Sequence, residues 1–284
     1  ENLLPILRKR IFVKTDTSSL AKSLKLRRKN KNDSESKEIE RELWDQIKIS
    51  VLSRLILSSY CVIFLNLMLQ VQMTIMGRNY LEKEDSDIDS KKIVLTNTYG
   101  YFLGDGLELF VNDTKKSVEE VSKNWNCQTK FSVQIEEFVC LVDDIRKILE
   151  AGFLNGSFSS NNENPLLKYM ANLETEGTCD RKDVSSEGTT DTVSSPGEIK
   201  PEKWVMDETW DIVESPGFTV ALKDSLDCGF RILFQQLKEK IFTSDEGMPI
   251  CTPLASLISS CKTISSEIVE ISPKNEYFSM MELV

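Results

Sequence analysis

The feature that most constrains this chain is an uncharged stretch of 23 residues, 55–77, which lies between Arg54 and Arg78. That length alone would allow a membrane span. Serine, asparagine, glutamine and threonine interrupt the stretch, however, and a helical pattern of apolar residues enters it from the charged sequence upstream. A helix that is apolar on all sides is expected where other helices surround it. The composition therefore favours a buried central helix over about residues 37–80 rather than a membrane span.

The rest of the chain repeats the same helical spacing. Apolar residues recur by threes and fours in one segment after another, whereas the alternation typical of strands is not sustained anywhere. This pattern predicts an all-α fold. Besides the central helix, the expected helical segments are 3–12, 18–26, 103–121, 131–149, 204–213, 222–241 and 254–271.

The polar segments between these helices predict loops within one domain. We expect a single helical-bundle domain over residues 1–284, with polar, mobile loops near 27–36, 82–92 and 154–203. A shorter turn is expected at Gly104-Asp105-Gly106, with Asp105 capping the helix that follows.

Charge is divided unevenly along the chain. The formal net charge is −10, yet residues 1–54 hold 14 basic and 8 acidic side chains, a net charge of +6. The densest basic part, residues 25–31, continues into acidic sequence and has no interleaved aromatic residues. With a pI near 4.9, the chain is not expected to bind nucleic acid.

The residue types that most hydrolases and metal sites require are missing. The sequence contains no histidine, and its seven cysteines include no C-x-x-C pair. Histidine-based triads, histidine-ligated zinc and redox motifs are thereby excluded, and no phosphate-binding glycine loop is present. Scattered single cysteines are typical of a reducing compartment. We therefore expect no enzymatic activity, no cofactor and no metal, in a domain that faces the cytosol.

Trp44 differs from the other aromatic residues because of its surroundings. It lies in a polar part of the long helix, in the sequence ERELWDQI at residues 40–47. Exposed aromatic rings beside apolar neighbours are typical anchors for a partner helix. From the surrounding sequence alone, a core position for Trp44 is the simpler interpretation. Both interpretations, core residue and partner anchor, remain open at this point.

Several blocks of sequence, in order, resemble the peroxin-3 family. LWDQIKIS (43–50) followed by QVQMTIMGR (70–78) is similar to the long-helix signature of that family. YFLGDGL (101–107) resembles its LGDGL block, and ETWDIVESPGF (208–218) resembles its ETRDxLESPDF block. The flanking segments match mainly in their apolar pattern.

The resemblance implies a single elongated helical bundle that is non-enzymatic and lies on the cytosolic face of the peroxisomal membrane. In the family, an N-terminal segment holds the bundle to the membrane, and we expect that segment to be absent from this sequence. The resemblance also implies a role in inserting peroxisomal membrane proteins, through an apolar groove that binds the N-terminal amphipathic helix of the import receptor peroxin-19. Carried over by position, the residues that would line this groove are Leu24, Lys25, Leu43, Trp44 and Ile47.

One position departs from the family pattern. A basic residue commonly lies one turn before the signature tryptophan, whereas this chain has Glu40 there, with Lys37 as the nearest preceding cation. Two other functions remain open: a helical scaffold for other peroxisomal partners, such as inheritance or autophagy receptors, and an enzyme of unrecognised type.

Overall fold

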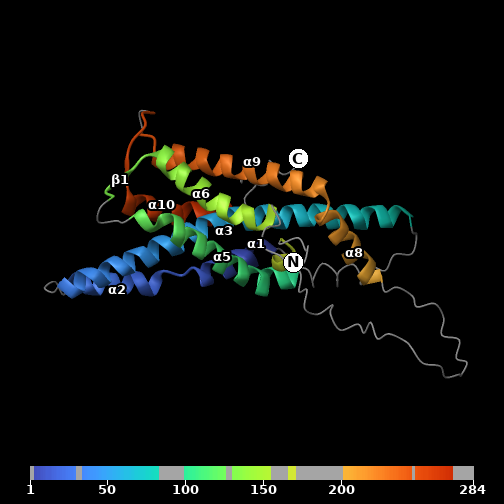
Figure 1. Cartoon of the computed structure of the whole chain (residues 1–284), viewed down its shortest axis with the longest axis horizontal. Coiled ribbons are helices and arrows are strands. Elements are labelled where there is room, and N and C mark those ends of the chain that lie inside the picture. The colour runs from blue at the N-terminus through green and yellow to red at the C-terminus, as the bar shows by residue number, and fades with distance from the viewer. Residues whose placement is uncertain are drawn as a thin grey trace, which may run out of the picture.

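The chain forms an elongated bundle of helices around one long central helix (Figure 1). The structure is a computed structural model, and it describes residues 3–29, 34–82, 99–125, 130–154, 166–170, 201–244 and 247–270. The all-α fold class and the central position of the long helix, both predicted from the sequence, are confirmed. Residues 271–284 lie outside the described residues, as do most of the predicted loops, so the mobility of those loops stays a prediction.

The central helix is α3 (Ser34–Glu82). Its 49 residues correspond to a length of about 70 Å. By length and composition α3 could cross a membrane, but 94% of its most apolar 18-residue window is buried by the other helices. The interpretation of the uncharged stretch as the buried core of a bundle agrees with this burial.

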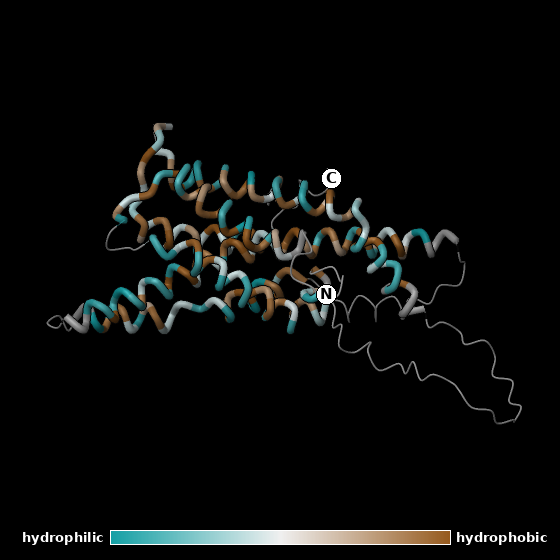
Figure 2. The backbone as a smooth tube through the Cα atoms, in the orientation of Figure 1, coloured by the Kyte–Doolittle hydropathy of each residue, from teal (hydrophilic) through white to brown (hydrophobic). Residues whose placement is uncertain are grey.

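The other helices pack along α3 from several sides, and α10, α5, α2 and α9 make the most extensive contacts with it. In Figure 2, α9 is hydrophilic along its outer edge and hydrophobic toward the bundle, as expected for a helix that covers a core. These helices are α1 (Leu3–Lys14), α2 (Ser18–Lys29), α5 (Leu107–Val121), α6 (Ile135–Leu154), α7 (Leu167–Met170), α8 (Pro201–Val213), α9 (Pro216–Ile241) and α10 (Leu254–Ile268).

Local sequence signals explain several helix boundaries. The Ser215 hydroxyl accepts a hydrogen bond from the Phe218 amide at 3.1 Å and caps α9, and Pro216 occupies the first turn. Asp16 accepts a hydrogen bond from the Ser18 amide at the start of α2. A feature that helical periodicity did not predict is the short antiparallel pair of β1 (Ser132–Val133) and β2 (Thr252–Pro253), which joins the entrances of α6 and α10.

The prediction for Asp105 is wrong. The residues before α5 form a π-helical turn, η1 (Phe102–Gly106), and Asp105 lies inside it. The N-cap of α5 is Gly106, and no side chain caps that end. The backbone departs from helical geometry at Gly104, so the two helical segments meet at a kink. Because α7 packs on this turn, tertiary contacts rather than a capping carboxylate determine its shape.

Gly106 allows α7 to approach the turn closely. A Cβ atom at this position would overlap the backbone carbonyl of Tyr169, whereas a Cβ atom at Gly100 would meet no other atom within 4 Å. We therefore expect Gly106→Ala to destabilise the protein by about 1–3 kcal/mol through overpacking. The matched control Gly100→Ala should leave stability unchanged or slightly higher. Urea denaturation of the two variants tests this, and equal midpoints would contradict the close contact.

Candidate functional site

The residues implied by the resemblance lie where α2 packs along the first part of α3. This pair of helices forms one end of the elongated bundle, at the left of Figure 1. We call Leu24, Lys25, Leu43, Trp44 and Ile47 the Trp44 site. Leu24 and Lys25 come from α2, and the other three residues come from α3.

Burial differs among the members of the Trp44 site. Leu24 and Ile47 are 6% and 8% exposed and belong to the main hydrophobic core. Leu43 and Trp44 are half-buried and pack against the same core, whereas Lys25 is exposed. Trp44 therefore combines the two sequence-based interpretations, core residue and exposed anchor, because it packs against the core and is also partly accessible to solvent.

The charged side chains beside the Trp44 site differ between its two helices. On α2, Lys22, Lys25 and Arg27 are exposed, and the described side chains of that helix include no acid. At the start of α3, Glu38 and Glu42 are exposed. Lys37 and Arg41 of α3 are exposed as well, so the site has a basic side along α2 and side chains of both charges along α3.

Lys48 is a residue of this region that the sequence analysis missed. It is only 2% exposed, and its Nζ atom donates to the Trp125 carbonyl at 2.8 Å and to the Ser122 carbonyl at 3.0 Å. It also pairs with Asp45 at 3.0 Å. The detectable signal was its position, because Lys48 lies one turn after Trp44 within the LWDQIKIS block (43–50).

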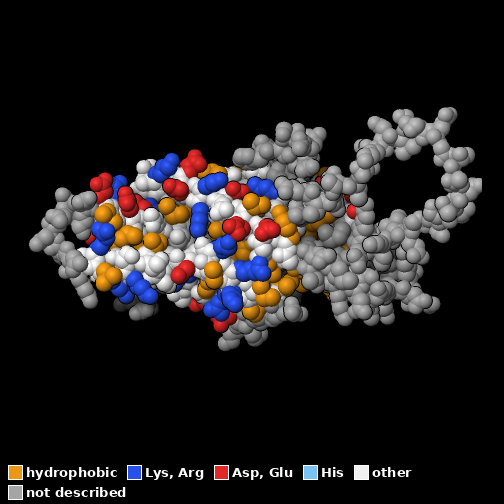
Figure 3. Space-filling view, turned by 90° about the horizontal axis from the view of Figure 1, so that it is seen from below, with side chains coloured by type: hydrophobic (Ala, Val, Ile, Leu, Met, Phe, Trp, Pro, Cys, Tyr) orange, Lys and Arg blue, Asp and Glu red, His pale blue; other side chains and the backbone are white. Residues whose placement is uncertain are grey.

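A second concave surface lies elsewhere on the bundle. A groove of about 670 Å³ runs between α1 and the segment η1–α5, and its apolar lining includes Ile6, Val13 and Leu107. Two of the basic side chains that line the groove have partners within the chain. Arg10 donates to the Leu103 carbonyl at 2.6 Å, and Lys14 pairs with Glu108 at 2.7 Å. No residue of the Trp44 site lines this groove. Seen from below, basic, acidic and hydrophobic side chains are interspersed over the described surface (Figure 3).

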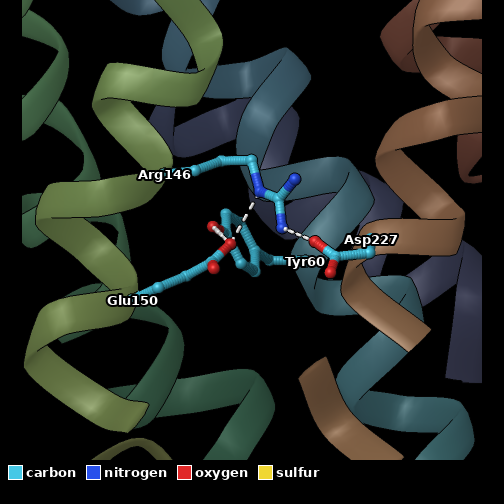
Figure 4. Close-up of polar contacts among 4 residues, drawn as sticks. All are labelled: Tyr60, Arg146, Glu150 and Asp227. Atoms are coloured by element: carbon cyan, nitrogen blue, oxygen red, sulfur yellow. Dashed lines mark hydrogen bonds and ion pairs between the residues drawn. The ribbon is translucent and has the colours of Figure 1, made fainter. Parts of the chain in front are cut away.

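A cluster of four polar side chains links α3, α6 and α9 (Figure 4). Arg146 pairs with Glu150 at 2.7 Å and with Asp227 at 2.6 Å, and Glu150 accepts a hydrogen bond from the Tyr60 hydroxyl at 2.8 Å. Burial, followed by the negative charge of Glu150, raises the pKa of Tyr60 well above its usual value. Desolvation opposes the charge of Arg146, but the hydrogen bonds to Asp227 and Glu150 prevail and raise the pKa of its guanidinium.

The chemistry available to this cluster is structural rather than catalytic. The phenol and the guanidinium both keep their protons at neutral pH, so neither can act as a general base. The two buried thiols also keep their protons at neutral pH, because burial raises the pKa of Cys261 to about 12 and raises that of Cys61 further. Within the described ranges, no group of three or more metal-ligating side chains is placed to hold a metal ion.

Because Arg146 bridges two carboxylates, its removal should destabilise the bundle. We expect Arg146→Met to cost about 3 kcal/mol, since it leaves the largely buried Glu150 carboxylate without its cation. The neighbouring exposed pair of Lys147 and Asp144 supplies the control, and Lys147→Met should cost less than about 1 kcal/mol. Chemical denaturation at neutral pH measures both values, and an Arg146→Met variant as stable as the unaltered chain would show that this cluster does not hold the three helices together.

Comparison with known proteins adds independent information on this region. The family model described as Peroxin-3 matches residues 15–86, which span α2, α3 and every member of the Trp44 site. Human peroxisomal biogenesis factor 3 is 23% identical over 284 residues, covering 96% of this chain and 69% of that protein.

More distant organisms give the same result. Peroxisome biogenesis factor 3 of Dictyostelium discoideum is 27% identical over 244 residues, covering 81% of this chain and 56% of that protein. Peroxisome biogenesis protein 3-2 of Arabidopsis thaliana is 22% identical, covering 84% of this chain and 64% of that protein. The similarity extends along nearly the whole bundle and agrees with the ordered sequence blocks, so the chain resembles Peroxin-3 proteins over most of its length.

Proposed function

We propose that this chain is a docking factor on the cytosolic face of the peroxisomal membrane, and that its Trp44 site binds the N-terminal amphipathic helix of peroxin-19. The family supplies the general context, because it is non-enzymatic, has a role in peroxisome biogenesis and associates with the peroxisomal membrane. Binding of the receptor would bring newly made membrane proteins to that membrane for insertion. An N-terminal membrane anchor, as in the family, would hold the bundle there.

The observation that carries the proposal is the half-buried ring of Trp44 in the segment that matches the family. Most of the large apolar side chains of α3 are buried beyond the reach of a partner. Trp44 instead keeps part of its ring accessible while the rest packs on the core. Such a ring is held in place before binding, so a partner that covers it gains apolar contact at little cost in side-chain ordering.

The two helices of the Trp44 site suit a helical partner. An amphipathic helix binds by laying its apolar face along a hydrophobic surface, with anchor residues at helical spacing. Leu24 and Ile47 would form the floor under such a helix, and Leu43 with Trp44 would form one side. Lys25 is exposed and could pair with an acidic residue of the partner at the rim. Glu40, which replaces the commonly basic residue of the family, would favour a partner residue that is basic or neutral at that point.

A second candidate function is a scaffold for other peroxisomal partners, such as inheritance or autophagy receptors. The groove between α1 and α5 favours this alternative, because it offers a separate concave surface with an apolar lining. Competition separates the two functions. A partner that uses this groove remains bound when the receptor helix saturates the Trp44 site, whereas a partner of the Trp44 site is displaced.

We expect Trp44→Ala to weaken binding of the peroxin-19 N-terminal helix far more than it weakens the fold. A central aromatic anchor contributes about 2–4 kcal/mol, which corresponds to roughly thirty- to a thousandfold in affinity. Titration calorimetry with a synthetic receptor helix measures the affinity, and a thermal melt of the same sample measures the fold. Leu24→Ala and Ile47→Ala should also weaken binding. Truncating such buried residues costs about 2–5 kcal/mol of stability, however, so these variants do not distinguish a loss of binding from a loss of fold.

Trp210 provides the matched control for this experiment. It is also a half-buried tryptophan that packs on the main core, but it lies in α8, outside the Trp44 site. Trp210→Ala should therefore lower the melting temperature and leave the affinity for the receptor helix within about twofold. Unchanged affinity of Trp44→Ala together with a collapsed melt would assign that ring to the core and remove the proposed docking site.

A further inference from the structure

We propose that Lys48 is a positioning residue for the Trp44 site. Its buried ammonium group ties the turn after α5, residues 122–125, to the face of α3 that carries Trp44, and the turn thereby becomes a fixed wall against which the receptor helix lies. This inference rests on the proposed function of the Trp44 site.

The contacts of Lys48 satisfy all three N–H groups of its ammonium. Two go to the carbonyls of Ser122 and Trp125, and the third goes to Asp45. An ammonium group that is 2% exposed is costly to bury unless all its hydrogen bonds are made. Lys48 is therefore held in one position, unlike a surface lysine that samples many rotamers.

The turn that Lys48 binds is the C-terminal end of a helix. Helix α5 ends at Val121, the 3₁₀ turn η2 (Ser122–Asn124) follows, and the Trp125 amide donates to the Ser122 carbonyl at 3.0 Å. Carbonyl groups at a helix C-terminus lack partners within the helix and carry a partial negative charge. The ammonium of Lys48, which belongs to α3, donates hydrogen bonds to these carbonyl groups. It therefore connects the end of α5 to α3.

The far end of the turn is held by α6. The Trp125 ring lies 6.3 Å from the Phe138 ring between centroids, and the Lys130 ammonium lies 4.8 Å from the Trp125 centroid. The turn is thus attached to α3 on one side and to α6 on the other. If Lys48 were replaced, the contact of Trp125 with Phe138 of α6 and the packing of α5 on α3 would remain, and the turn would lose its polar bonds to α3.

The position of Lys48 on α3 connects the turn with the docking site. Residues four apart lie on the same face of a helix, so Lys48 is one turn beyond Trp44, and Ile47 precedes it directly. A receptor helix that covers Trp44 would therefore lie close to the Ser122–Trp125 backbone, at a distance of about one lysine side chain. A wall fixed in advance lowers the ordering cost of binding, and this is the means by which Lys48 would raise affinity without touching the partner.

Three variants of the full chain test this role. Lys48→Met keeps most of the side-chain volume and removes the ammonium, and we expect it to lower affinity for a synthetic peroxin-19 N-terminal helix about tenfold at a temperature where the variant remains folded. Lys48→Arg keeps a cation with several donors and should recover most of the affinity. Lys115→Met is the control, because Lys115 also donates to a backbone carbonyl, that of Lys14 at 3.0 Å, on a helix end away from the site; its affinity should match that of the unaltered chain.

Hydrogen exchange gives a second measurement, and its comparison of the unaltered chain with and without the receptor helix does not depend on a variant folding. The Trp125 amide should exchange more slowly when the receptor helix is bound, because the helix covers the turn, and it should exchange faster in Lys48→Met than in Lys115→Met. Lys48→Met that binds like the unaltered chain, or a Trp125 amide that the receptor helix leaves unaffected, overturns the positioning role. If those results occur while Trp44→Ala loses binding, only this inference fails; if the unaltered chain does not bind the helix, the proposed function fails with it.

Discussion

Burial of the middle of α3 is the constraint on which the rest of the structure depends. A helix that is apolar on every side has no face for water, so it is stable only when other helices cover it completely. Each of its large apolar side chains contributes about 1.5–3 kcal/mol when it is removed from water. The amphipathic helices α5, α9 and α10 meet this need, and rings from separate elements converge on it, with Tyr60 lying 5.6 Å from Phe110 and 5.1 Å from Phe230 between centroids.

The buried cations of α3 share one physical task. Lys48 binds carbonyls at the end of α5, and Arg54, which is 3% exposed, binds the Thr15 carbonyl and hydroxyl just after α1. Both side chains neutralise the partial negative charge of a helix C-terminus that the bundle has buried. The bundle therefore aligns α1 and α5 against α3 with directional polar bonds, in addition to hydrophobic contact. Close to Trp44, that alignment would also determine the surface that the proposed partner meets.

Much of the fold and part of the candidate site could be predicted from the sequence. Helical spacing predicted both ends of the long helix within a few residues, because charged sequence flanks its apolar pattern on both sides. The resemblance led to Trp44, but it did not reveal that Leu24 and Ile47 would already be buried in the free protein. It also gave no indication of what Lys48 binds or of the groove beside α1, since both depend on elements that lie far apart in the chain.

By itself, the sequence determined that the chain is helical, that residues 55–77 need to be covered, and that histidine-dependent chemistry is absent, since these properties follow from residue type and local spacing. Only the tertiary structure decided which polar groups share a buried position. Lys48 became a bridge because the end of α5 lies beside it, and the Arg146 guanidinium joins Glu150 of its own helix to Asp227 of α9. A buried charge or carbonyl needs a partner wherever the fold places it, and that partner is determined by packing between distant segments, which local sequence does not encode.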